Sequence, residues 1–269
     1  MQNHAPTPDY KERMSEHVTS EIIDRIQVLR IQRPDKKNAL TQAMYGALAD
    51  ALAAADADPQ IRCSLITGVD EVFTSGNDIA DFLKAPNTGN DSPVVRFLNN
   101  IATAKKPVVA AVNGLAIGVG VTMLLHCDLV YAASDARLQL PFVNIGICPA
   151  AASSLIMPRM MGQQRANELL LLGEMFDAAT AHEYGMVNAV VPRDELFNHA
   201  MDRCRRLAAQ PPNALRTTKA LLRGIDAEQI KQTMSKEFQT FAPMLQGPEA
   251  LEAMGAFMQK RKPDFSQFD

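Results

Sequence analysis

The chain has 269 residues, of which 47% are hydrophobic and 21% are charged, so it carries enough apolar surface for a large folded domain and too much for a disordered chain. Its 27 lysines and arginines nearly balance 30 aspartates and glutamates, giving a net charge of −3 that provides no overall attraction for nucleic acid or an anionic membrane. No apolar run reaches the length of a membrane helix, and the four cysteines lack the paired spacing of a zinc site. We expect a cytoplasmic protein with no metal.

The first part of the chain predicts a tail, a strand, a helix and a second strand. Residues 1–19 are polar without an apolar period, which is typical of a flexible tail. The run 22–31 is rich in β-branched residues and predicts one strand. A helix then follows, because Thr41 is a good N-cap and apolar residues recur every three to four positions until Asp58. Residues 61–67 predict a buried strand.

The middle of the chain repeats the order strand, strand, helix. The run 106–114 contains a continuously apolar strand, two short strands follow it, and glycine-bearing loops lead into helices. This order predicts an α/β spiral. Beyond residue 162 the sequence is mostly helical. We therefore predict a spiral core over residues 20–205 and a helical C-terminal region over residues 206–269.

Two loops have the composition of an anion-binding site. Residues 73–78 read F-T-S-G-N-D, and residues 113–122 read N-G-L-A-I-G-V-G-V-T. Each lies between a strand and the start of a helix, where backbone N–H groups have no helical carbonyl as acceptor. Two such groups aimed at one point form an oxyanion hole. The alternative is that the glycines serve only turns and close packing, and spacing alone leaves both interpretations open.

These loops belong to a set of motifs that spans nearly the whole chain: R-P followed by N-A-L within 33–40, F-T-S-G-N-D-I at 73–79, K-P-V-V-A-A-V-N-G at 106–114, C-D-L-V-Y-A at 127–132, Y-G-M-V-N at 184–188 and K-R-K-P at 260–263. The set resembles the enoyl-CoA hydratase/isomerase (crotonase) superfamily, and its first loop is most similar to the peroxisomal-type 3,2-enoyl-CoA isomerase branch. The resemblance implies a crotonase-like spiral of ββα units with a C-terminal helical trimerisation region. It also implies a homotrimer or dimer of trimers that acts on acyl-CoA thioesters, with CoA entering as part of the substrate and no other cofactor.

The resemblance also implies roles for particular residues. The oxyanion hole would consist of the backbone N–H groups of Asn77 and Val119, which would polarise the thioester carbonyl and hold an enolate. Further substrate contacts would come from the two loops and the C-terminus, at Gly76, Asp78, Ile79, Ala80, Gly118, Gly120, Phe257 and Lys260.

The catalytic carboxylates of the family are missing from all three positions at which the resemblance places them. Hydration needs two facing carboxylates, and those positions hold Thr122 and Phe142. Isomerisation of a 3-enoyl to a 2-enoyl thioester needs one base, and the remaining position holds Ala150. The first loop nevertheless makes this isomerisation the leading named activity. A base would then come from elsewhere, with Asp81 and Glu71 as sequence-near candidates.

Other interpretations fit the same residues. A decarboxylase needs no base, because loss of carbon dioxide itself generates the enolate; a thioesterase of the same fold and a non-catalytic acyl-CoA-binding paralogue are further alternatives. His126 lies in an apolar helix end, which is typical of a core or capping residue. Cys148 has no neighbouring cation to activate it, so we do not predict a nucleophile there.

Overall fold

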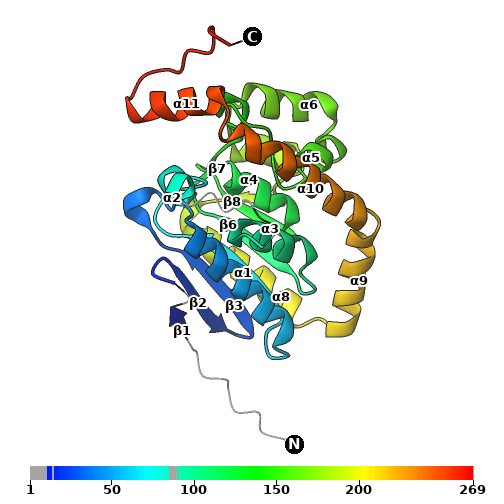
Figure 1. The fold of residues 1–269 in the computed structure, drawn as a ribbon. Coiled ribbons are helices and arrows are strands. Elements are labelled where there is room, and N and C mark those ends of the chain that lie inside the picture. The colour runs from blue at the N-terminus through cyan, green and yellow to red at the C-terminus, as the bar shows by residue number, and fades with distance from the viewer. Residues whose placement is uncertain (1–10, 14, 85–88, 90, 269) are drawn as a thin grey trace, which may run out of the picture.

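The computed structural model describes residues 11–13, 15–84, 89 and 91–268, which form two sheets surrounded by helices (Figure 1). Part of the predicted tail, residues 1–10 and 14, lies outside the described residues. The rest of that prediction is wrong, because Lys11–Arg13 form a strand and Val18, which is fully buried, begins another. Lys11–Arg13 contain no apolar residue, so no hydrophobic pattern indicated this strand, and charged residues are common on edge strands such as β1.

The strands of the larger sheet lie in the order β1 (Lys11–Arg13), β2 (Val18–Ile23), β3 (Ile26–Ile31), β4 (Cys63–Gly68), β6 (Val108–Val112), β8 (Leu129–Ala133) and β11 (Ala189–Val191). Those of the smaller sheet lie in the order β10 (Met175–Asp177), β9 (Arg137–Gln139), β7 (Leu115–Ile117) and β5 (Val72–Thr74). The α-helices are α1 (Gln42–Ala57), α2 (Ile79–Lys84), α3 (Pro93–Thr103), α4 (Val119–Thr122), α5 (Ser153–Met161), α6 (Gln163–Asn167), α7 (Ala178–Glu183), α8 (Arg193–Ala208), α9 (Pro212–Gly224), α10 (Ala227–Met244) and α11 (Pro248–Met258). Helical turns of the 3₁₀ type are η1 (Pro34–Lys36), η2 (Met123–His126) and η3 (Val143–Ile145), and η4 (Glu168–Leu172) is a π-helical turn.

The single strand predicted over residues 22–31 is instead a hairpin of β2 and β3. Asp24 and Arg25 reverse the chain with φ angles of 51° and 65°, the left-handed conformation that a two-residue hairpin turn of type I′ requires. The Arg25 guanidinium donates hydrogen bonds to the carbonyl oxygens of Pro59 and Gln60, which holds this unusual turn residue in place. The turn has none of the usual Asn-Gly sequence, so the reversal could not be recognised from the pattern.

The predicted ββα spiral is confirmed by the way in which strands alternate between the sheets. In the pairs β4–β5, β6–β7 and β8–β9, the first strand joins the larger sheet and the second joins the smaller sheet. Strands β5 and β7 pair in parallel, so their carboxyl ends lie side by side at one edge. This pairing brings together the two glycine-bearing segments, because β5 leads directly into residues 75–78 and β7, which lies within residues 113–122, leads directly into Gly118.

Helices cover both faces of the larger sheet and extend beyond it. Helices α1 and α3 lie in front of the sheet in Figure 1, whereas α8 packs behind it on β4, β6 and β8. The hydroxyl of Thr41 accepts a hydrogen bond from the Met44 N–H, as expected for the N-cap of α1. The predicted domain boundary after residue 205 falls inside α8, which belongs to the core, so the helical C-terminal region begins with α9. Within the described ranges, none of the helices combines the length and apolarity needed to cross a membrane.

Candidate functional site

The two glycine-bearing loops are packed closely against each other at Gly76 and Gly120, where little room is left for a side chain. A Cβ built on Gly120 would lie 2.7 Å from the side chain of Thr74, and one built on Gly76 would lie 3.0 Å from the carbonyl oxygen of Ile117. Gly76 also has a φ of +90°, which L-residues rarely adopt. The two interpretations of these glycines are therefore compatible, because close packing is what places the two loops side by side.

The Asn77 backbone N–H makes no hydrogen bond to any residue that the structure describes. On either side of it, the Leu40 N–H donates to the Gly76 carbonyl at 2.8 Å and the Asp78 N–H donates to the Leu40 carbonyl at 2.9 Å. In such a bridge, alternate peptide groups point in opposite directions, so the Asn77 N–H faces away from Leu40. The first loop thus presents one unsatisfied donor.

The second loop presents a donor of the same kind at Val119, the first residue of α4. The Gly118 carbonyl accepts the N–H groups of Val121 and Thr122, whereas the Val119 N–H has no acceptor among the described residues. An unsatisfied N–H is expected at the start of a helix, where no preceding turn supplies a carbonyl. Asn77 and Val119 line the same cavity, which is one condition that an oxyanion hole built from these two donors must meet.

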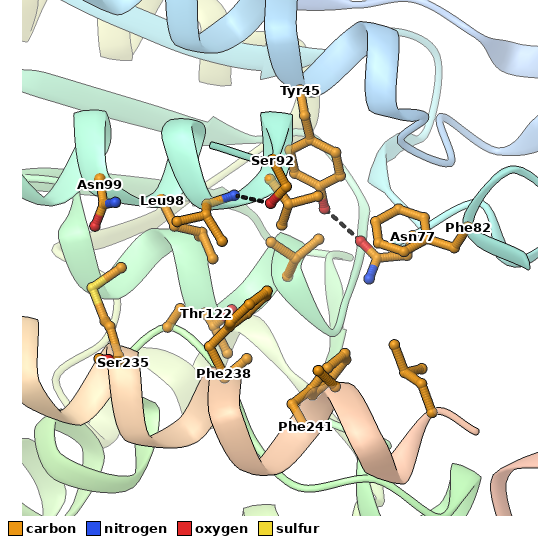
Figure 2. A pocket seen from close by; sticks show the side chains of 18 of the residues that line it. Tyr45, Asn77, Phe82, Ser92, Leu98, Asn99, Thr122, Ser235, Phe238 and Phe241 are labelled. Carbon is orange, nitrogen blue, oxygen red and sulfur yellow. Dashed lines mark hydrogen bonds between the residues drawn. The ribbon is translucent and has the colours of Figure 1, made fainter. Parts of the chain in front are cut away.

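This cavity has a volume of about 360 Å³ and lies between α1, α3, α4 and α10 (Figure 2). Most of its wall is apolar, with Phe82, Leu98, Phe238 and Phe241 among the contributing side chains. No carboxylate lines it within the part of the chain that the structure describes. The cavity therefore suits an uncharged or electron-rich acyl group.

The structure brings together the three positions that the family resemblance assigns to carboxylates. Thr122, Phe142 and Ala150 all line the cavity, together with Asn77 and Val119. The hydroxyl of Thr122 is buried and has no hydrogen-bond partner in the described ranges. These positions therefore face the space where a bound acyl group would lie, although none of them carries an acid or a base.

The two sequence-near carboxylates proposed as substitutes do not reach this cavity. The Asp81 carboxylate accepts a hydrogen bond from the Gln42 N–H at 2.7 Å, at the start of α1. The Glu71 side chain is 80% exposed and pairs with Arg193 at 3.5 Å. Neither residue lines the cavity. The hypothesis that one of them replaces the missing base is therefore wrong for an acyl group bound in this cavity.

The surroundings of His126 and Cys148 suit structural residues and not a catalytic base or nucleophile, as the sequence indicated. His126 is almost fully buried, and its Nε2 donates to the Ala151 carbonyl at 2.8 Å. Burial lowers the pKa of His126 to about 4, so the ring is neutral at physiological pH. Burial, together with the nearby Glu237, raises the pKa of the Cys148 thiol, which is the opposite of what an activated nucleophile needs.

The residues expected to bind CoA lie outside the cavity lining. Asp78 forms an ion pair with Arg33 at 2.6 Å. Although partial burial acts in the opposite direction, the Arg33 hydrogen bond and a backbone N–H lower the pKa of Asp78. Its own N–H and carbonyl are already bonded to Leu40 and Phe82, which leaves only the second lone pair of the carbonyl for a ligand.

The remaining residues of that set are more accessible. Ile79 and Ala80 form the first turn of α2, directly beside the first loop. Phe257 is 74% exposed at the end of α11, and Lys260 follows it in a left-handed turn with a φ of 55°. Their contact with CoA stays a prediction.

Sequence reasoning missed Tyr45, whose hydroxyl donates a hydrogen bond to Asn77 Oδ1 at 2.5 Å (Figure 2). Tyr45 lies on the buried face of α1, where the spacing of apolar residues indicates only core packing. Nothing in the local sequence distinguishes a core tyrosine from one whose hydroxyl meets a loop 32 positions away.

Two backbone N–H groups that have no acceptor among the described residues, on residues that line one largely apolar cavity, are suited to binding the carbonyl oxygen of an acyl group. The family model described as enoyl-CoA hydratase/isomerase matches residues 21–268. The chain belongs to this family, which acts on acyl-CoA thioesters.

Individual relatives extend over nearly the whole chain. The 1,2-epoxyphenylacetyl-CoA isomerase of Escherichia coli K12 is 32% identical over 94% of this chain and 99% of its own length. Enoyl-CoA delta isomerase 2 of Rattus norvegicus is 34% identical over 91% of this chain, which spans 63% of that relative. The solved structure of Pseudomonas aeruginosa OdaA is 46% identical, covers 91% of this chain and 99% of its own, and has a TM-score of 0.89.

Proposed function

We propose that the protein binds an acyl-CoA thioester with its acyl group in the cavity and its thioester oxygen between the N–H groups of Asn77 and Val119. The observation that carries this proposal is that both donors lack protein acceptors in the described ranges and belong to residues that line one apolar cavity. Each donor in a comparable site stabilises the developing oxyanion by about 3 kcal/mol. The protein would therefore favour reactions that pass through a thioester enolate.

Isomerisation of a 3-enoyl-CoA to a 2-enoyl-CoA is the first such reaction. It is supported by the S-G-N-D loop and by relatives that are named isomerases. The reaction needs a group that removes a proton from C2 and returns it at C4. Because Ala150 stands at the carboxylate position, this group would have to come from the substrate, a bound water or a residue outside the described lining.

Decarboxylation of a malonyl-type thioester is the second candidate, favoured by the lack of a carboxylate in the described lining. In this reaction the bond between C2 and the substrate carboxylate breaks, and its electron pair forms the enolate that the two N–H groups hold. Carbon dioxide leaves, and water then supplies a proton to C2. No protein base is needed, and no protein anion repels the substrate carboxylate.

A panel of thioesters separates these reactions. The purified protein would be incubated with 3-hexenoyl-CoA, 2-hexenoyl-CoA, malonyl-CoA and methylmalonyl-CoA, and the products would be resolved by chromatography. Formation of 2-enoyl-CoA supports isomerisation, and formation of acetyl-CoA or propionyl-CoA supports decarboxylation. If none of these thioesters binds in a calorimetric titration, the acyl-CoA assignment itself is wrong; binding without turnover identifies a non-catalytic paralogue.

We also propose that the chain self-associates into a trimer or a dimer of trimers. Leu221, Leu222 and Ile225, at the end of α9, are each more than 70% exposed, which is unfavourable for a surface that meets only water. Leu222 also lines a second cavity between α5, α9 and α10, whose wall combines apolar side chains with Arg159, Arg223 and Asp226. Sedimentation analysis of the wild type and of Leu222→Glu tests this proposal, which predicts dissociation or a smaller assembly for the variant.

A further inference from the structure

The Tyr45 hydroxyl is held in one position by its surroundings. Tyr45 is fully buried, and its ring packs against Phe97 with a centroid distance of 5.6 Å and against Phe82 at 6.3 Å. Burial raises the pKa of Tyr45, so the hydroxyl keeps its proton and acts as a donor. Its acceptor is the side-chain oxygen of Asn77, which orients the amide group of that residue.

This bond decides what Asn77 presents to the cavity. With Oδ1 occupied by the tyrosine, the Nδ2 group points away from Tyr45 toward the side of the cavity where Phe241 lies (Figure 2). Nδ2 has no hydrogen-bond acceptor among the residues that the structure describes, although it carries two protons. Asn77, which lines the cavity, therefore carries two donors without an acceptor among the described residues: its backbone N–H and its side-chain amide.

We propose that the Asn77 side-chain amide binds an oxygen atom on C3 of the acyl group, and that Tyr45 is the positioning residue for this contact. The inference rests on the proposed function, in which the backbone N–H of the same residue binds the thioester oxygen. The side-chain amide of Asn77 lies one side-chain length from this backbone N–H, so it would reach the acyl atoms next to the thioester carbonyl. Acyl groups with a C3 oxygen, namely 3-oxoacyl and malonyl-type thioesters, would then be preferred over hydrocarbon chains.

The placement of the amide favours the acyl group over the CoA moiety as its partner. The residues expected to contact CoA, including Ile79, Ala80 and Lys260, lie outside the lining of the cavity, whereas Asn77 lies within it beside Phe82. The described lining also contains no carboxylate that would repel an electron-rich oxygen or compete for the amide protons. A hydrocarbon chain at this place would leave Nδ2 desolvated without an acceptor, which is unfavourable.

Two ligands of equal length test the inference: butyryl-CoA and acetoacetyl-CoA differ on C3 by an oxygen. Their affinities would be measured by titration calorimetry for the wild type and for Asn77→Ala, which keeps the backbone N–H. We expect the ratio of the affinities, acetoacetyl-CoA over butyryl-CoA, to fall about tenfold in this variant, because a hydrogen bond is lost for one ligand only. Asn77→Asp keeps the shape without the donor and should lower the ratio at least as much.

Tyr45→Phe distinguishes positioning from simple packing. It should lower the same ratio in the wild-type background and leave it unchanged in the Asn77→Ala background, since the amide to be oriented is then absent. Phe241→Leu is the matched control, because it alters the cavity wall and should affect both ligands alike. If Asn77→Ala weakens both ligands equally, the contact with a C3 oxygen is refuted while the thioester site stands. If the wild type binds neither ligand, the proposed function fails, and this inference fails with it.

Discussion

His126 and Glu237 bind opposite sides of a single peptide group, the one that joins Ala151 to Ala152. The His126 ring donates to the Ala151 carbonyl at 2.8 Å, and the Ala152 N–H donates to the Glu237 carboxylate at 2.6 Å. Both alanines have left-handed φ angles, 64° and 55°, which are uncommon for residues with a Cβ. Because Ala151 lines the cavity, these two buried side chains fix the shape of its wall.

The first prediction concerns the pH dependence that His126 gives to stability. Its pKa falls from the ordinary value of 6.5 to about 4 on folding, so its contribution is fully present above pH 6.5 and is lost as the pH falls through 4. A shift of this size corresponds to about 3 kcal/mol. We expect the melting temperature of the wild type to fall across this window. His126→Gln keeps an N–H donor without titrating, so its melting temperature should fall less over the same range; parallel curves for both proteins would contradict the prediction.

The second prediction concerns Glu237, whose carboxylate accepts hydrogen bonds from the backbone N–H groups of Ala152 and Ser154 and from the Ser154 hydroxyl. Glu237→Ala leaves these buried donors without an acceptor, and we expect the free energy of unfolding to fall by about 2–4 kcal/mol. Lys236→Ala removes the exposed neighbouring side chain of α10 and should change it by less than about 0.5 kcal/mol. Urea denaturation of both variants measures the difference, and equal values would show that the carboxylate does not hold this turn.

The third prediction restores a carboxylate to the cavity through Ala150→Glu. Ala150 lines the cavity with Asn77 and Val119, so a carboxylate there would face the bound acyl group, and burial would raise its pKa toward that of an effective base. We expect the rate of 3-enoyl-CoA isomerisation to rise by a factor of about 100 or more. Ala150→Gln has nearly the same shape and cannot take a proton, so it serves as the control. A folded Ala150→Glu protein that is no faster than the glutamine variant would show that this turn does not face C2 and C4.

The sequence predicted the parts of this molecule that depend on local chemistry. The glycine loops, the N-cap at Thr41 and the alternation of strands and helices follow from residues near one another in the chain. Tyr45 and Glu237 could not be recognised, because each lies within a regular helix and meets its partners, 32 and 83–85 positions away, only after folding. A glutamate in a long amphipathic helix is usually solvated, and only the burial of this one against α5 reveals its role.

The last prediction removes one N–H donor while leaving the helix that carries it intact. Val119 is the first residue of α4, a position where proline is well tolerated because the N–H has no helical acceptor and the fixed φ of proline is compatible with a helix. Val119→Pro therefore deletes the proposed donor itself, whereas Val119→Ala shortens the side chain and keeps the N–H. We expect the turnover of whichever thioester the wild type converts to fall 100-fold or more in the proline variant and by only a small factor in the alanine variant. Both proteins would be compared by circular dichroism to verify folding before their rates are measured. The two variants differ chiefly in the backbone N–H, which alanine keeps and proline lacks. Equal rates in two folded variants would therefore mean that the N–H of residue 119 does not bind the carbonyl oxygen.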